Sequence, residues 1–259
     1  MIAMDHTIPC ICLRRPLMSL SLPHKQNEDN VTMPPTPSNL STAGKHLASM
    51  IDHTFLKQDG TARDVERLCG EARDYGFCAV CVLPALLPVA VANLKGSSII
   101  PCTVAGFPLG ASTTASKAFE AGEAAAAGAR EVDMVLAVWA IRDRQFQRAQ
   151  LDIASVVKAA GPGCNIKVII ETCLLTDEEK ITACRLAVAA GARFVKTSTG
   201  LAGGGATISD VRLMRATVGP EIGVKASGGI RSAGEAAALL EAGANRLGTS
   251  AGIAIVTQS

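Results

Sequence analysis

Short apolar runs alternate with amphipathic segments along the chain from about residue 51 to the C-terminus. Each run is followed by an Ala- or Glu-rich stretch whose apolar positions recur at helical spacing. The runs begin near Ile51, Cys78, Ile99, Glu131, Ile166, Phe194, Ile222 and Arg246. Eight strands that alternate with helices in one domain predict a parallel (β/α)8 barrel, the TIM-barrel architecture, rather than an open sheet.

The starts of four predicted helices share a capping pattern. In each, a hydroxyl residue is followed three positions later by Asp or Glu, which suits reciprocal hydrogen bonds with the free N–H groups of the first turn. The pairs are Thr61 with Asp64, Thr176 with Glu179, Thr207 with Asp210, and Ser232 with Glu235. Their recurrence in successive units supports the same barrel.

A six-residue template that begins with glycine occurs four times. Its glycines, each expected to end a helix in the left-handed conformation before a strand, are Gly76, Gly128, Gly191 and Gly243. The sixth position is then equivalent in four strands and holds Cys81, Asp133, Lys196 and Gly248. Because strand residues alternate between two faces and Val195 suits the helix side, Lys196 and Asp133 are predicted to point into the barrel.

Residues 1–44 differ in composition from the rest of the chain. They contain six of the twelve prolines and show no sustained hydrophobic periodicity. We therefore expect a disordered N-terminal extension over residues 1–44 and one barrel domain over residues 45–259. The first twenty residues have no uninterrupted apolar core, which argues against a secretory signal; an organellar transit peptide is a weaker alternative.

Composition narrows the classes of function. The chain is 48% hydrophobic and 19% charged, with a formal net charge of +2 and scattered Lys and Arg residues. We expect no transmembrane helix, and no cationic surface for nucleic acid or a membrane. The nine cysteines, an odd number placed mostly in apolar segments, suit buried thiols in a reducing cytoplasm.

Metal and cofactor sites are not predicted. Cys78 and Cys81 have CxxC spacing, but no second pair follows, and both fall in an expected buried strand. Of the four histidines only His53 is expected near the barrel mouth, which is too few for a zinc-dependent aldolase. The chain contains neither a GxGxxG turn opening a βαβ unit nor a P-loop.

The chemistry is predicted to centre on two strand lysines. Lys196 and Lys225 lie in adjacent strands, so their side chains should meet near the barrel mouth. Two partly desolvated cations in contact favour the loss of one proton, which leaves a neutral amine able to attack a carbonyl. Asp133, two strands away from Lys196, could hold Lys225 charged and relay protons through water. A buried salt bridge would explain any one of these residues, whereas their convergence favours catalysis.

Two further charged residues belong to the fifth strand. Lys167 is expected at the start of that strand, at the end of the barrel away from the chemistry, and therefore in a structural role. Glu171 lies at the opposite end, where it either lines the site or has no part in it.

Glycine-rich turns follow the seventh and eighth predicted strands. The first contains Gly228, Gly229 and Arg231, and the second contains Gly248 and Ser250. Turns at these places in a barrel commonly bind phosphate through backbone N–H groups and a helix N-terminus. Residues 199–205, which include Gly200, could add a flexible lid.

Seven segments, in chain order, resemble the signature sequences of the deoxyribose-phosphate aldolase family. They are residues 51–54, 80–84, 104–110, 131–135, 171–175, 195–200 and 224–231. The resemblance covers the chain from about Ile51 to its end. It implies a class I aldolase, a lyase without a metal or cofactor that forms a Schiff base. Such an enzyme reversibly cleaves 2-deoxy-D-ribose 5-phosphate to acetaldehyde and D-glyceraldehyde 3-phosphate, in deoxyribose phosphate catabolism.

The resemblance also assigns roles by position. Lys196 matches the Schiff-base lysine, and Lys225 the second lysine that keeps it deprotonated. Asp133 matches the proton-relay carboxylate, and Asp52 an acidic residue that supports the relay. The phosphate-contacting positions are matched by Gly200, Gly228, Gly229, Arg231, Gly248 and Ser250.

Two departures from the family pattern lie near the C-terminus. Ala251 stands where many relatives have a second serine, which removes one phosphate donor. Residues 256–259 lack the terminal tyrosine that some members place near the substrate, a change that bears on turnover more than on the chemistry.

Two other functions stay open at this stage. The first is a Schiff-base aldolase for another phosphorylated sugar, because loop side chains decide such preferences. The second is a non-catalytic barrel that binds a sugar phosphate or a partner protein, against which Lys196, Lys225 and Asp133 argue together. The expected partners are a small phosphorylated sugar and an aldehyde, and a homo-oligomer is an alternative to a monomer.

Overall fold

The computed structural model describes residues 40–258. Most of the predicted N-terminal extension, residues 1–39, therefore lies outside this description. Helix α1 (Thr42–Ala48) begins before the predicted domain boundary at residue 45, and its N-cap Ser41 accepts a hydrogen bond from the Gly44 amide.

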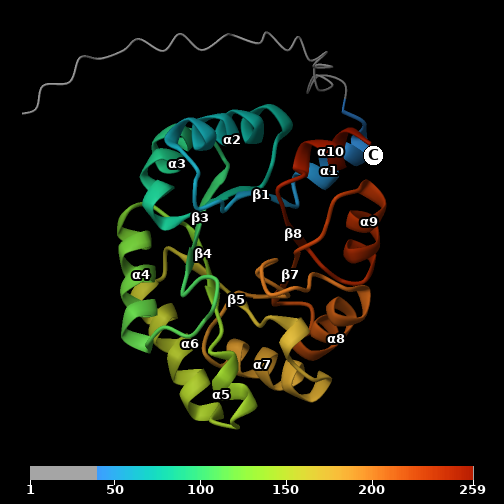
Figure 1. Ribbon diagram of the computed structural model, residues 1–259. Coiled ribbons are helices and arrows are strands. Elements are labelled where there is room, and N and C mark those ends of the chain that lie inside the picture. The colour runs from blue at the N-terminus through green and yellow to red at the C-terminus, as the bar shows by residue number, and fades with distance from the viewer. Residues whose placement is uncertain (1–39, 259) are drawn as a thin grey trace, which may run out of the picture. The chain divides into compact units, whose positions relative to one another are not determined.

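Eight parallel strands form a closed barrel in chain order, with β1 paired to both β2 and β8 (Figure 1). The strands are β1 Ile51–Phe55, β2 Ala79–Val82, β3 Ile100–Ala105, β4 Glu131–Val135, β5 Asn165–Ile169, β6 Phe194–Lys196, β7 Gly223–Ser227 and β8 Arg246–Thr249. Each begins within one residue of its predicted start, so the predicted (β/α)8 barrel is confirmed.

Helices surround the strands in Figure 1 and bury their apolar faces against them. They are α2 Ala62–Tyr75, α3 Leu87–Leu94, α4 Thr114–Ala126, α5 Val138–Arg142, α6 Phe146–Ala160, α7 Asp177–Ala189, α8 Ile208–Val218, α9 Ala233–Glu241 and α10 Gly252–Thr257. Two short 3-10 turns, η2 Pro84–Leu86 and η3 Thr172–Leu174, follow β2 and β5. None of the described helices is both long and apolar enough to cross a bilayer.

Three of the four predicted capping boxes are complete, at Thr61, Thr176 and Ser232. The fourth is half formed. Thr207 accepts a hydrogen bond from the Asp210 amide at 3.1 Å, but the Asp210 carboxylate pairs with Lys180 on α7 at 2.7 Å. A tertiary ion pair therefore takes the carboxylate that the local pattern assigned to the cap.

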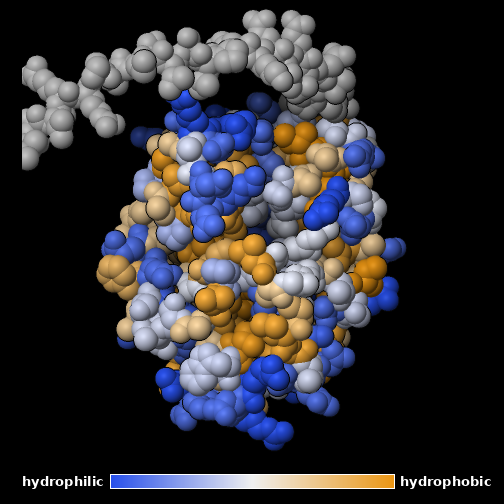
Figure 2. Space-filling model, viewed as in Figure 1, coloured by the Kyte–Doolittle hydropathy of each residue, from blue (hydrophilic) through white to orange (hydrophobic). Residues whose placement is uncertain are grey.

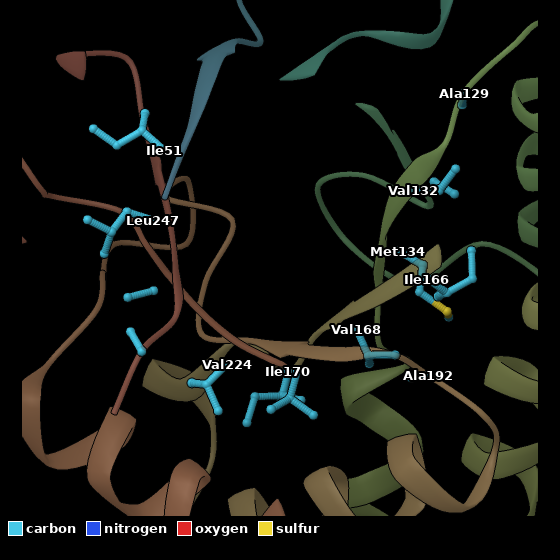
Figure 3. Close-up of a cluster of buried hydrophobic side chains, with 14 of the residues drawn as sticks. Ile51, Ala129, Val132, Met134, Ile166, Val168, Ile170, Ala192, Val224 and Leu247 are labelled. Carbon is cyan, nitrogen blue, oxygen red and sulfur yellow. The ribbon is translucent and has the colours of Figure 1, made fainter. Parts of the chain in front are cut away.

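The glycine template sets the orientation of the strands that follow it. All four of its glycines have positive φ, from 72° at Gly76 to 112° at Gly243. Figure 3 shows Val132 and Met134 of β4, Val224 of β7 and Leu247 of β8 pointing away from the barrel centre. The alternate residues therefore point inward, as predicted, and these include Asp133 and Lys225.

Candidate active site

Asp133 joins the two predicted lysines inside the barrel. Its Oδ2 accepts hydrogen bonds from Lys196 Nζ and Lys225 Nζ, each at 2.7 Å. Lys196 and Lys225 are register partners on β6 and β7, and all three side chains are buried. The predicted convergence of two lysines and one carboxylate is therefore present.

Asp52 of β1 closes the group from the opposite wall. Its Oδ2 accepts a hydrogen bond from Lys225 Nζ at 2.5 Å, and its Oδ1 one from Arg246 Nη1 at 2.7 Å. Lys225 thus bridges the carboxylates of Asp52 and Asp133. Within this group of residues, Lys196 donates its hydrogen bond to Asp133.

Lys167 was placed wrongly by the sequence interpretation. It is the register partner of Asp133, and its Nζ donates to Asp133 Oδ1 at 2.8 Å. The same ammonium pairs with Glu131 at 2.6 Å and lies 3.7 Å from Asp52. Strands β4 and β5 pair residue for residue from Glu131 with Asn165, so Lys167 at the middle of β5 lies beside Asp133 at the middle of β4. Lys167 therefore belongs to the charged group that holds Asp133.

Glu131 and Arg246 were not singled out from the sequence. The Arg246 guanidinium joins Glu131 at 3.1 Å to Asp52 at 2.7 Å, so it ties β8 to β4 and β1. A usable signal was present: Glu131 lies two positions before Asp133, and Arg246 two before Gly248. Strand alternation turns residues at that spacing to the same face.

Charge pairing fixes the ionisation of this group. Burial by itself raises the pKa of Asp133, but the ammoniums of Lys167, Lys196 and Lys225 outweigh it and hold that pKa well below its ordinary value. Burial by itself lowers the pKa of Lys225, but the Asp133 and Asp52 carboxylates hold it above its usual range. In the resting enzyme Lys225 is therefore a cation and Asp133 an anion.

The buried group contains one more basic side chain than it has carboxylates. The carboxylates are Asp52, Glu131 and Asp133, and the basic groups are Lys167, Lys196, Lys225 and Arg246. With Lys196 as a free amine, three cations face three anions, and no net charge is buried. Of the three lysines, Lys196 is the most exposed, and it is the one that lines the cavity described next.

A cavity of about 310 Å³ opens above this group, at the carboxyl ends of the strands. Lys196 lies in its wall, together with Lys57, Phe107 and Thr199. All six predicted phosphate-binding residues also line it: Gly200, Gly228, Gly229, Arg231, Gly248 and Ser250. The charged residues of this lining are Lys57, Lys196 and Arg231, so the cavity suits an anionic ligand.

Two glycine loops pack closely at one side of this cavity. A Cβ added to Gly205 would lie 2.3 Å from the Gly228 carbonyl oxygen, which leaves no room for a side chain. Gly228 has φ of 89°, a conformation that favours glycine. The Ala206 amide also donates to the Gly228 carbonyl, at 3.0 Å, so the loop after β6 and the loop after β7 are held together.

Glu171 supports the site without lining it. Its carboxylate accepts hydrogen bonds from the Thr199 hydroxyl at 2.6 Å and from the Thr199 amide at 3.2 Å. Glu171 is buried and has φ of 55°, the left-handed region that non-glycine residues rarely adopt. It therefore anchors the start of the segment 199–205 that the sequence suggested as a lid.

Two sets of described side chains bring possible metal-ligand atoms within 4.8 Å of one another. They are Cys81, Cys102 and Asp133, and Asp52, Cys102 and Glu131. The carboxylates of both sets are already paired with lysine or arginine. His53 points to the helix side of β1 instead, with its Nε2 2.7 Å from Glu71 Oε2. The carboxylate oxygens that could bind a metal ion are therefore already bound by lysine and arginine side chains.

Comparison with known proteins identifies the family. The sequence profile of the DeoC/LacD family aldolases matches residues 46–258. The chain belongs to this family of aldolases. It is therefore an aldehyde-lyase, and the resemblance seen in the sequence is confirmed.

Similar proteins extend over nearly all of the described residues. The chain is 55% identical over 212 residues to a deoxyribose-phosphate aldolase of Lysinibacillus sphaericus, covering 82% of this chain and 95% of that one. It is 56% identical, with the same coverage, to deoxyribose-phosphate aldolase 1 of Bacillus licheniformis. A solved structure of the Aeropyrum pernix deoxyribose phosphate aldolase, described as tetrameric, is 33% identical with a TM-score of 0.78. It aligns with 85% of this chain and 94% of its own.

Gly248 of this aldolase leaves room for the Lys225 side chain. A Cβ at residue 248 would lie 2.8 Å from Lys225 Cε and 3.0 Å from Ser227 Cβ. The Gly248→Ala enzyme should therefore displace Lys225 from Asp52 and lower kcat by about 10²-fold. Steady-state kinetics check this, with Gly234→Ala as control because nothing lies within 4 Å of its added Cβ. Equal kinetics for Gly248→Ala and the wild type would show that Lys225 tolerates the shift.

The buried charges also predict how stability depends on pH. Asp52 and Asp133 have lowered pKa values in the folded protein, so their stabilisation is present above their unfolded pKa of about 3.9 and is lost as the pH falls below it. Lys225 has a raised pKa, so its contribution is lost as the pH rises beyond its unfolded value of about 10.4. Urea midpoints should therefore be flat from about pH 5 to 9. A steep fall between pH 7 and 5 would point to other groups.

Proposed function

We propose that this aldolase cleaves 2-deoxy-D-ribose 5-phosphate reversibly to acetaldehyde and D-glyceraldehyde 3-phosphate through a Schiff base on Lys196. The observation that carries the proposal is the position of Lys196. Its ammonium or amine group lies in the wall of a cavity lined by cations and glycine loops, and it contacts the buried carboxylate of Asp133. The amine and the anion-binding region therefore share one cavity, and the proton carrier lies in contact with the amine.

The reaction begins with attack of the free Lys196 amine on the C1 aldehyde of the open-chain sugar. The Asp133 carboxylate, 2.7 Å from Lys196 Nζ, then moves one proton from the nitrogen to the oxygen of the adduct and relays a second from solvent, so that water leaves and the protonated Schiff base forms. The Asp133 carboxylate accepts the C3 hydroxyl proton through water, the C2–C3 bond breaks and D-glyceraldehyde 3-phosphate leaves, and the electron pair of that bond forms the enamine on Lys196. Protonation at C2 and hydrolysis release acetaldehyde and free the amine.

Lys225 and Asp52 act on this sequence through Asp133. Lys225 remains charged between the two carboxylates, which keeps Asp133 ionised and adds positive charge beside the developing oxyanions. Arg246 and Lys167 hold the far oxygens of Asp52 and Asp133 in place. We assign Lys225 and Asp52 to the catalytic machinery, and Lys167, Glu131 and Arg246 to its positioning.

The sugar phosphate is assigned to the glycine loops after β6, β7 and β8. Gly200, Gly228, Gly229, Gly248 and Ser250 would offer backbone or hydroxyl donors, and the nearby Arg231 a positive charge. These residues line the same cavity as Lys196, as a five-carbon substrate with its aldehyde and phosphate at opposite ends requires. The high identity to two deoxyribose-phosphate aldolases favours this sugar over another phosphorylated sugar.

Borohydride trapping tests this proposal directly. The full-length enzyme is incubated with 2-deoxyribose 5-phosphate, reduced with borohydride, digested and mapped by mass spectrometry. A reduced two-carbon adduct on Lys196 is expected, because the enamine left after cleavage carries C1 and C2. Absence of an adduct on folded protein would reject this substrate, and an adduct on Lys225 or Lys167 would show that the nucleophile was assigned wrongly.

We also propose that the aldolase forms a homo-oligomer in the cytoplasm. The Aeropyrum pernix relative is described as tetrameric. Several large hydrophobic side chains are exposed here, including Leu109 at 80%, Phe119 at 69% and Leu151 at 58%. Figure 2 shows apolar surface just below the centre of the view, near the place of α7 in Figure 1, and hydrophilic surface along the bottom, around α5. Light scattering of the purified chain would reveal a monomer if the proposal is wrong.

A further inference from the structure

Two cysteines face each other inside the barrel, beside the catalytic carboxylate. Cys81 of β2 and Cys102 of β3 are register partners, and both are fully buried. Their sulfur atoms and an Asp133 carboxylate oxygen all lie within 4.8 Å of one another. The proposed aldol reaction uses neither thiol. We propose that Cys81 and Cys102 form a reversible intramolecular disulfide when the enzyme meets a peroxide, and that this bond switches the aldolase off.

The backbone already places the two residues at a suitable separation. Neighbouring strands lie about 4.8 Å apart, within the Cα separation of about 4.4–6.8 Å that disulfides use. Both side chains belong to one small cluster inside the barrel, composed of Ala79, Cys81, Cys102 and Val104. Rotation of the side chains, without a change of strand pairing, is therefore enough to bring the two sulfurs together.

The surroundings shift the pKa values of the two thiols in opposite directions and so assign them different roles. A hydrogen bond from the Cys102 thiol, aided by the charges of Lys225 and Lys196, lowers the pKa of Cys81 in spite of its burial. Burial raises the pKa of Cys102, and its hydrogen bond to Cys81 adds to the rise. Cys81 is thus the first to react as a thiolate, and Cys102 is the resolving thiol.

The oxidant is a small peroxide, such as hydrogen peroxide. Leu56 and Phe107 line the active-site cavity and also pack against the cysteine cluster, which places the thiols directly beneath the cavity. The Cys81 thiolate attacks one peroxide oxygen, the O–O bond breaks, and the sulfenic acid and hydroxide form. Cys102 then attacks the sulfenic sulfur, its proton combines with the departing hydroxide, and water leaves. Two thiols and one hydrogen peroxide give one disulfide and two waters.

The disulfide would disturb the catalytic group through Asp133. Cys102 Sγ lies 3.5 Å from Asp133 Oδ1, and it accepts a hydrogen bond from Lys167 Nζ at 3.3 Å. Bonding to Cys81 removes the thiol proton and draws this sulfur away from both partners. Because Asp133 also holds Lys196, the oxidised enzyme should lose turnover. This effect on activity rests on the proposed function, whereas formation of the bond does not.

The test treats reduced full-length enzyme with hydrogen peroxide, blocks the remaining thiols and digests it without reductant. Lys95 separates the two cysteines, so trypsin places them on different peptides that only a disulfide joins. Tandem mass spectrometry then distinguishes Cys81 from Cys78 on the first peptide. The expected result is a Cys81–Cys102 linkage, a loss of activity of at least about tenfold, and recovery with dithiothreitol.

Variants separate this switch from other oxidations. The Cys102→Ala enzyme should form no linkage, and peroxide should take its Cys81 to the sulfinic acid, so that dithiothreitol no longer restores activity. Cys173→Ser, which removes an exposed thiol, should behave as the wild type does. Absence of the linkage, or a linkage with unchanged activity, would overturn the proposal. An enzyme inactive on 2-deoxyribose 5-phosphate before oxidation would instead reject the proposed function.

Discussion

The Lys196→Ala enzyme is expected to lose activity by about 10⁴–10⁶-fold while it keeps its fold. Removal of the nucleophile leaves, among the described residues, no lysine that both lines the cavity and contacts Asp133. Stability should change little. Asp133 keeps hydrogen bonds from Lys225 at 2.7 Å and Lys167 at 2.8 Å, so no charge is left without a partner. Steady-state kinetics and a urea unfolding curve measure both effects.

Matched variants make this result specific. Lys196→Arg retains a cation but no nucleophilic amine, so it should be as inactive as Lys196→Ala and should form no borohydride adduct. Lys180→Ala removes a lysine at the periphery that pairs with Asp177 and Asp210, and it should retain nearly full activity. Substantial turnover by Lys196→Ala, with an adduct at Lys225, would transfer the role of nucleophile to that residue.

Asp133→Asn should lower both activity and stability. The carboxylate is the shared partner of Lys167, Lys196 and Lys225, and its loss leaves an excess of buried positive charge. Breaking such a pairing typically costs about 3–5 kcal/mol in the free energy of unfolding. Loss of a proton carrier in contact with the nucleophile should lower kcat by about 10²–10⁴-fold. Urea unfolding and kinetics at a temperature where the variant is folded measure the two effects.

The Asp152→Asn variant is the control that separates loss of stability from loss of the proton carrier. Asp152 of α6 is also buried and pairs with the buried Lys117 at 2.7 Å, but it lies between α4 and α6, outside the catalytic group. Its replacement should destabilise the protein by a similar mechanism and leave kcat within about threefold of the wild-type value. If Asp152→Asn lost as much activity as Asp133→Asn, destabilisation of the barrel would explain both results. The proton-relay role of Asp133 would then be rejected.

The sequence alone determined the barrel and the groups that point into it. Alternation of apolar runs with helical segments fixed the number and order of strands, because both periodicities are local. The repeated glycine fixed where each strand begins, so Asp133 and Lys196 could be assigned to the interior from Val195 and the shared template. Lys225 followed from its place in the adjacent strand, and the phosphate loops from their place after the last two strands.

Only the tertiary structure decided which inward groups contact one another. Local patterns define the face of a strand, but the stagger between strands depends on closure of the whole barrel. Closure of the barrel and the pairing of its strands brought Lys167 to Asp133 and joined Arg246 to Glu131 across 115 positions of sequence. They likewise placed Cys81 opposite Cys102. Ion pairs and register are long-range properties, and for that reason Lys167 was misplaced and the cysteine pair was missed.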